Sequence, residues 1–81
     1  MQFTVKMITK IHPRGCTVTL DMPEGTTVGE MMDYLLQTEE LKPYPDLFFE
    51  HTCVRRGMMM CRDEVLSHGD NVTIAKLLSG G

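Results

Sequence analysis

The sequence has no apolar run that approaches the ~20 residues a helix needs to cross a bilayer. Residues 1–6 lack the basic and then apolar pattern of a secretory signal peptide. The eight lysines and arginines are scattered, and only Arg55 and Arg56 are adjacent. The clustered basic surface that neutralises phosphates is therefore missing. These absences predict a cytoplasmic protein that neither spans a membrane nor has nucleic-acid binding as its main role.

Cysteine is also scarce, with only Cys16, Cys53 and Cys61. An odd number without paired spacing indicates reduced thiols. Zinc sites need paired ligands at tight spacing, and His51 with Cys53 and Cys61 supplies only one close pair. A glycine-rich phosphate loop is absent, and so small a domain offers little cleft for a cysteine nucleophile. The sequence therefore predicts no metal site.

The 81 residues suffice for one small domain. Hydrophobic residues make up 42% of them, too many for a disordered chain. Methionine is unusually frequent, with eight residues that include the run Met58–Met60. Methionine fills gaps in cores and also coats adaptable binding surfaces. Because neighbours on a strand face opposite sides, at least one residue of this run is expected to be exposed, unless the run lies on a loop.

Two runs of alternating apolar and polar residues, at positions 3–7 and 16–22, predict strands with one buried face. The alternation breaks at Ile8 and Ile11, which indicates a strand end or a bulge. Between the runs, residues 12–15 carry a proline and a glycine and are typical of a turn. The two strands are therefore predicted to form a hairpin.

A helix is predicted after this hairpin. Thr27 and Glu30 have the spacing of a capping box, in which a hydroxyl and a carboxylate three residues later satisfy free N–H groups. The apolar residues that follow recur at intervals of three and four, which places them along one side of a helix of about three turns. They are Val28, Met31, Met32, Leu35 and Leu36.

The second half of the chain is predicted to add β-structure. Pro43 and Pro45 exclude regular helix and central strand from residues 39–46. In order, we then expect a third strand, a turn, a short fourth strand over the methionines, an irregular or briefly helical stretch, a turn and a last strand, at residues 47–54, 55–57, 58–60, 61–66, 67–71 and 72–78. Val72 and Ile74 are expected to share one face of the last strand.

These elements predict an α+β fold with a mixed sheet of four or five strands wrapped over one amphipathic helix. The hairpin and the helix each have an apolar face that neither can bury alone. A last strand that runs beside the first would lie centrally and parallel to it. Its end would then leave the sheet and carry Ser79, Gly80 and Gly81 into solvent.

The two final glycines are the most informative feature of the sequence. They have no β-carbon, so their backbone can thread a narrow slot. A free α-carboxyl titrates near ~3.5, so the Gly81 carboxylate would be ionised at neutral pH. We expect residues 1–78 to form the domain and residues 79–81 to form a flexible tail whose carboxylate carries the function. A frayed polar end is the competing interpretation.

Three motifs relate this sequence to a known family. Residues 66–74 follow the pattern Leu, two residues, Gly-Asp, one residue, Val, one residue, Ile, and Gly80-Gly81 follow in turn. A weaker motif, Pro23-Glu24-Gly25-Thr26-Thr27-Val28, leads into the helix. In these motifs and in the order of its elements, the whole chain resembles the ubiquitin-like β-grasp sulfur carriers of the ThiS/MoaD group. That group includes the thiamine-pathway carrier and the small subunit of molybdopterin synthase.

The resemblance implies that the tail carries the chemistry. In that group, an ATP-dependent adenylating enzyme activates the C-terminal carboxylate. The acyl adenylate then takes up sulfur as a thiocarboxylate, which a biosynthetic acceptor consumes. Gly81 would be the reacting residue and Gly80 would provide access, while the chain itself would bind no cofactor and would not be an enzyme. The implied partners are the adenylating enzyme, a sulfur donor such as a cysteine desulfurase or a sulfide source, and an acceptor synthase.

Partner contacts are expected on exposed residues around the tail, where an apolar patch with a polar rim is typical of an interface. The candidates are Leu77, Leu78, Ser79, Phe49, Arg55 and Arg56. Core packing competes with docking as the interpretation of Phe49 and Leu78. For Arg55 and Arg56, the competing interpretation is a solvated turn.

The sequence leaves other functions open. A ubiquitin-like protein modifier would use the same activation to form isopeptides with lysines of target proteins. The small subunit of a synthase would insert its tail into a large subunit and form a stable complex. A β-grasp interaction module would work without Gly80 and Gly81. Nothing in the sequence distinguishes a thiamine or molybdopterin-type pathway from that of another sulfur metabolite.

Overall fold

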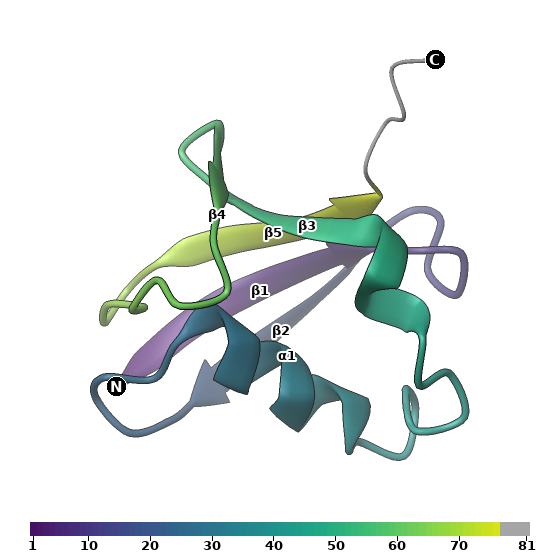
Figure 1. Ribbon diagram of the computed structural model, residues 1–81, viewed down its shortest axis with the longest axis horizontal. Coiled ribbons are helices and arrows are strands. Elements are labelled where there is room, and N and C mark those ends of the chain that lie inside the picture. Colours follow the sequence, from purple (N-terminus) through teal and green to yellow (C-terminus); the bar gives the residue numbers. More distant parts are fainter. Residues whose placement is uncertain (77–81) are drawn as a thin grey trace.

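The computed structural model describes residues 1–76, which form five strands, one α-helix and one 3-10 helix (Figure 1). In chain order these are β1 (Gln2–Ile8), β2 (Cys16–Asp21), α1 (Val28–Leu36), the 3-10 helix η1 (Leu47–Glu50), β3 (His51–Arg55), β4 (Met58–Met60) and β5 (Asn71–Lys76). The strands make one mixed sheet in the order β2-β1-β5-β3-β4. The predicted sheet over one helix is confirmed, with five strands.

The first and last strands lie side by side at the centre of the sheet. β1 and β5 are parallel, with Val5 opposite Val72 and Met7 opposite Ile74. β2 pairs with the other edge of β1 as the predicted hairpin. β3 is antiparallel to β5 and carries β4 on its far side. The prediction of a central, parallel last strand is therefore confirmed.

The hydrophobic core lies between the sheet and α1, which crosses one face of the sheet (Figure 1). Alternate residues of the central strands point into it, so that Val5 and Ile74 are fully buried. The helix begins at the predicted capping box. The Thr27 hydroxyl accepts a hydrogen bond from the Glu30 N–H at 3.2 Å, and the Thr27 N–H donates to the Glu30 carboxylate at 3.1 Å. The apolar stripe of the helix thereby faces the sheet.

One sequence expectation is wrong. Residues 47–54 were expected to form one strand, but the segment begins as η1 and becomes β3 only at His51. Leu47 and Phe48 are both buried, whereas Phe49 is exposed. Two consecutive residues cannot point to the same side of a strand, but they can in a tight helical turn. Burying this pair therefore requires the 3-10 turn.

The methionine run Met58–Met60 forms the short strand β4, as predicted. Met58 and Met59 are exposed and Met60 is buried, so the expectation that at least one residue of this run is exposed is confirmed. β5 is described as far as Lys76. The expected end of the strand, at residues 77 and 78, and the expected tail, 79–81, lie outside the described residues.

The Gly-Asp pair before β5 holds the turn together. Gly69 has a positive φ of +82°, which favours glycine, and its N–H donates to the Gln2 carbonyl at 2.7 Å. The Asp70 carboxylate accepts two hydrogen bonds of 2.8 Å, one from the Ser67 N–H and one from Nη1 of Arg55. The motif therefore links the turn to both β1 and β3.

Replacing Asp70 by alanine is expected to lower the free energy of unfolding by about 1–3 kcal/mol, because the substitution leaves two donors, one of them charged, without their partner. Asp21→Ala is the matched control, since the Asp21 side chain is 73% exposed and pairs with the terminal ammonium at 3.4 Å. Its effect should stay within about 0.5 kcal/mol. Urea denaturation of both variants measures the difference. Equal stability of the two variants would contradict this role of Asp70.

Candidate functional site

The residues expected to react lie beyond the described part of the chain. Gly80 and Gly81, with the expected contact residues Leu77, Leu78 and Ser79, are outside the described residues. The structure does define the position of the residue before them, because Lys76 is the last described residue of β5, a central strand. The surface around Lys76 is therefore the part of the candidate site that can be analysed.

A groove of about 460 Å³ lies beside this point, and we call it the tail-root groove. Its lining residues are Ile8, Thr9, Lys10, Asp46, Leu47, Phe49, Glu50, His51 and Lys76. They come from the ends of β1 and β5, from η1 and from the start of β3. The sheet register brings them together, because Ile8 pairs with Ala75, and His51 pairs with Lys76.

The tail-root groove combines apolar surface with charges at its margin. Phe49 is 81% exposed and Ile8 is 36% exposed. An exposed phenylalanine of this kind is typical of a protein contact surface. Lys76 and Glu50 carry the nearby charges, with Nζ and Oε2 3.9 Å apart and both side chains largely in solvent. Core packing is therefore the wrong interpretation of Phe49, whose neighbour Phe48 fills the core instead.

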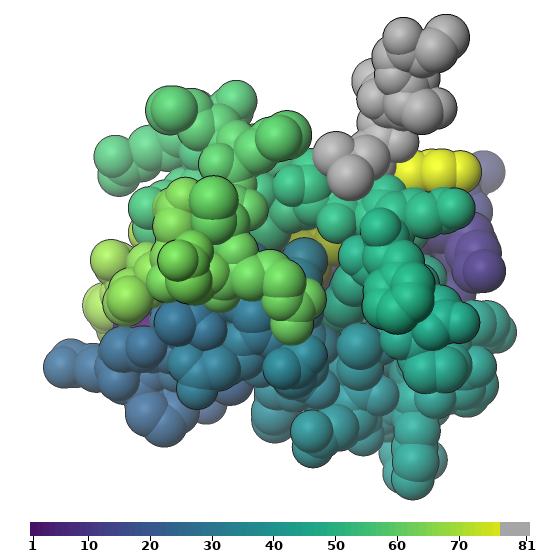
Figure 2. All heavy atoms as spheres, viewed as in Figure 1, coloured from purple at the N-terminus to yellow at the C-terminus, as the bar shows by residue number. Residues whose placement is uncertain are grey.

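The structure does not bring Arg55 and Arg56 to this groove. Both lie at the other end of β3, at the turn into β4. In Figure 2 this turn is green and η1 is teal, and they lie on opposite sides of the view. Arg55 is ion-paired with Asp70 at 2.8 Å and Glu64 at 3.8 Å. Arg56 is exposed, with a positive φ of 53°. Arg55 therefore serves the fold, and their predicted role as rim charges remains a prediction.

Sequence reasoning missed Ile8, Lys10, Glu50 and Lys76 as groove residues. One signal was available, because parallel pairing of the first and last strands places the ends of both at the same edge of the sheet. The place of Glu50 in the groove depends on η1. A strand over residues 47–54 would have placed Phe49 and Glu50 on opposite faces of the sheet rather than together in one turn.

The thiols differ sharply in environment. Cys53 is 1% exposed, and its burial raises the pKa of the thiol to about 11, a rise that Arg55 opposes and Glu64 supports. Cys61 is exposed, and Cys16 is intermediate. Within residues 1–76, no three side chains from histidine, cysteine, aspartate and glutamate form a metal-binding group. None of the helices described has the length and apolar character needed to cross a membrane.

Comparison with known proteins is informative at the level of structure. No family model and no curated protein matches the sequence. SAMP1 from Haloferax volcanii is similar in structure, with 20% identity, a TM-score of 0.75 and all of both chains covered. Ubiquitin from Caldiarchaeum subterraneum is also similar, with 17% identity, a TM-score of 0.60 and both chains fully covered. The chain has a ubiquitin-like β-grasp fold.

The ubiquitin-like β-grasp fold predicted from the sequence is thus confirmed. A second structure of H. volcanii small archaeal modifier protein 1 matches with 20% identity and a TM-score of 0.71, over 90% of this chain and 93% of the other. Identities this low establish the fold and not the ThiS/MoaD family. Within the ubiquitin-like fold, the tail-root groove lies beside Lys76, the last described residue of the central strand β5.

The thiol environments predict selective alkylation. In the folded protein at pH 8, a thiol with a pKa near 11 is roughly one part in a thousand thiolate, the reactive form. Iodoacetamide should therefore modify Cys61 and spare Cys53, and all three cysteines should react in denaturant. Peptide mass spectrometry at timed intervals measures this. If Cys53 were alkylated as fast as Cys61, the buried position of the Cys53 thiol would be wrong.

Proposed function

We propose that this protein is a sulfur carrier that works through the carboxylate of Gly81. An ATP-dependent enzyme adenylates this carboxylate, and sulfur then converts it to a thiocarboxylate for the synthesis of a cofactor of the thiamine or molybdopterin type or of another sulfur metabolite. The best support for the proposal is the position of the two final glycines in the sequence. Gly80 and Gly81 follow four and five residues after Lys76, the last described residue of a central strand in a ubiquitin-like β-grasp fold. Lys76 itself lines an exposed groove.

The proposed chemistry has two steps. A Gly81 carboxylate oxygen attacks the α-phosphorus of ATP, the bond to the β-phosphate breaks, and pyrophosphate leaves. Hydrosulfide then attacks the carbonyl carbon of the acyl adenylate, and AMP leaves with the electron pair of the broken C–O bond. A thiocarboxylate and a proton remain. Activation is needed because a carboxylate is a poor electrophile, whereas AMP is a good leaving group.

The chain itself contributes access and docking to this reaction. A glycine pair has no side chains, so it can enter a narrow site in the activating enzyme. Phe49 and Ile8 offer apolar contact area next to the root of the tail, and Lys76 and Glu50 offer charges at its margin. The reactive groups belong to the partners. We place the reaction in the cytoplasm, with a cysteine desulfurase or sulfide as sulfur source and an acceptor synthase as consumer.

A protein modifier is the second candidate function. Two of the similar structures are of SAMP1, the small archaeal modifier protein 1 of H. volcanii. In a modifier, the amine of a target lysine rather than hydrosulfide would attack the activated carbonyl and form an isopeptide. The activation step and the tail-root groove would serve both functions equally. The two functions therefore differ in the nucleophile that takes the acyl group.

Intact-mass spectrometry separates these functions. The protein is incubated with ATP, sulfide and adenylating enzymes of its own organism, with a variant that lacks Gly81 as control. The carrier function predicts a mass gain equal to the exchange of one oxygen for sulfur, located at Gly81 and absent from the control. Conjugation to lysines without a thiocarboxylate would favour the modifier. A chain unchanged by every activating enzyme would favour an interaction module.

Truncating Phe49 should weaken docking of the activating enzyme. Loss of one exposed aromatic anchor costs on the order of 1 kcal/mol or more, so Phe49→Ala should raise the KM of that enzyme for this protein about fivefold or more, with little change in kcat. Tyr34→Ala is the matched control, because Tyr34 is 48% exposed and lies on α1. Steady-state kinetics of adenylation measure both variants. Equal KM values for the two would show that the tail-root groove is not the docking site.

A further inference from the structure

A smaller cavity, of about 210 Å³, lies between α1 and the strands β3 and β4. It adjoins the tail-root groove, because His51 lines both. Its lining includes Cys53 and Met60, the imidazole-bearing His51, and Met32 and Arg62 at its α1 side. Sulfur and nitrogen donors thus gather in one cavity.

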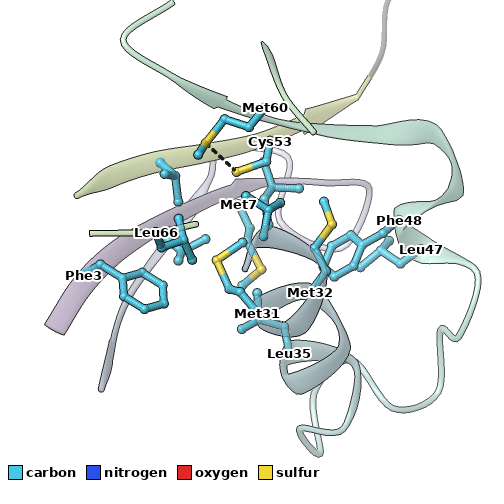
Figure 3. Packing of buried hydrophobic residues seen from close by; sticks show 14 of the residues in the cluster. Phe3, Met7, Met31, Met32, Leu35, Leu47, Phe48, Cys53, Met60 and Leu66 are labelled. Carbon is cyan, nitrogen blue, oxygen red and sulfur yellow. Dashed lines mark hydrogen bonds between the residues drawn. The ribbon is translucent and has the colours of Figure 1, made fainter. Parts of the chain in front are cut away.

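Two of the sulfur atoms face each other directly. Cys53 and Met60 are register partners across β3 and β4. The Cys53 Sγ lies 3.9 Å from the Met60 Sδ, and Figure 3 shows both sulfurs pointing toward each other from neighbouring strands. Cys53 is 1% exposed and Met60 is 8% exposed. The fold therefore holds a thiol and a thioether together in a site that water barely reaches.

The imidazole of His51 is a third possible donor group that lines this cavity. His51 precedes Cys53 by two residues on β3, so both point to the same side of the sheet. Both its ring nitrogens are buried, and neither has a hydrogen-bond partner among residues 1–76. A buried polar group without a partner costs free energy and calls for an explanation, of which a bound ion is one.

We propose that Cys53, Met60 and His51 form a binding site for Cu(I). Thiolate and thioether are soft ligands that select Cu(I) among biological metals, and imidazole also suits copper. Binding would replace the thiol proton, so Cys53–SH and Cu(I) would give a Cys53 thiolate–Cu(I) bond and one released proton. No electron is transferred in this step.

Charge favours a monovalent ion. A thiolate with Cu(I) is neutral overall, so the cavity would bury no net charge. A divalent ion would leave a positive charge beside Arg62, and zinc also prefers four ligands in a tetrahedron. The Arg62 guanidinium lies 3.7 Å from the Met32 Sδ, which leaves Met32 in the cavity wall rather than in the ligand set.

This site explains why the sequence predicts no metal. Within residues 1–76, histidine, cysteine and carboxylate side chains do not form a group of three that could hold a metal ion. Cys61, considered with His51 and Cys53 from the sequence, is exposed. The third ligand is instead a methionine, which is close to Cys53 only because of the β3–β4 register.

The test is anaerobic titration of the full chain with Cu(I) in competition with a chromogenic chelator. We expect one Cu(I) per chain, and X-ray absorption should report both sulfur and nitrogen ligands. Met60→Leu keeps the size of the side chain but removes the thioether, and should weaken binding by about tenfold or more, as loss of a metal contact does. Cys53→Ala and His51→Phe should weaken it at least as much.

Matched controls keep the outcome clear. Met58→Leu makes the same chemical change at a 74% exposed position, and Cys61→Ser removes the exposed thiol. Both should bind Cu(I) like the original protein. Circular dichroism checks that each variant is folded, and Met60→Leu decides the matter if Cys53→Ala does not fold. Failure of the original chain to compete for Cu(I), or losses as large for the controls as for Met60→Leu, would overturn the proposal.

Discussion

The parallel pairing of β1 with β5 is the constraint on which the rest of the structure depends. It joins the two ends of the described chain at the centre of the sheet, with Val5 opposite Val72 in the core. The turn before β5 secures it, since the Thr4 N–H donates to the Asp70 carbonyl at 2.9 Å and Gly69 donates to Gln2. Parallel strands end at the same edge of a sheet, so this pairing sets where Lys76 lies and which residues surround it.

Much of this fold is predictable from local patterns. Alternation at residues 3–7 and 16–22, the Thr27–Glu30 capping box and the turn before β5 each act over a few residues, so their meaning can be read without tertiary structure. The segment 47–54 could not be read this way. Its apolar residues also fit a strand, so the local pattern does not reveal the helix. The first turn is a 3-10 helix because the core buries both Leu47 and Phe48.

In the candidate sites, too, some features follow from local sequence patterns and others from tertiary structure. The proposed role of the final glycines rests on the sequence alone, and the groove beside Lys76 depends on the sheet register. Phe49 joins that groove because η1 turns it outward, whereas the ion pair of Arg55 with Asp70 joins residues that are 15 positions apart and cannot be read from a local pattern. The thiol–thioether pair of Cys53 and Met60 likewise exists only through the β3–β4 register. Local patterns identify residues that can react or bind, and long-range pairing decides which of them meet.

The central claim is that the Gly81 carboxylate is the group that partners activate. ATP–pyrophosphate exchange tests it most directly, because exchange requires reversible formation of the acyl adenylate and does not depend on what later takes the acyl group. The account predicts exchange with the chain that ends at Gly81, and none when Gly81 is deleted or when one residue is added after it. Undiminished exchange with the shortened or extended chain would contradict the account.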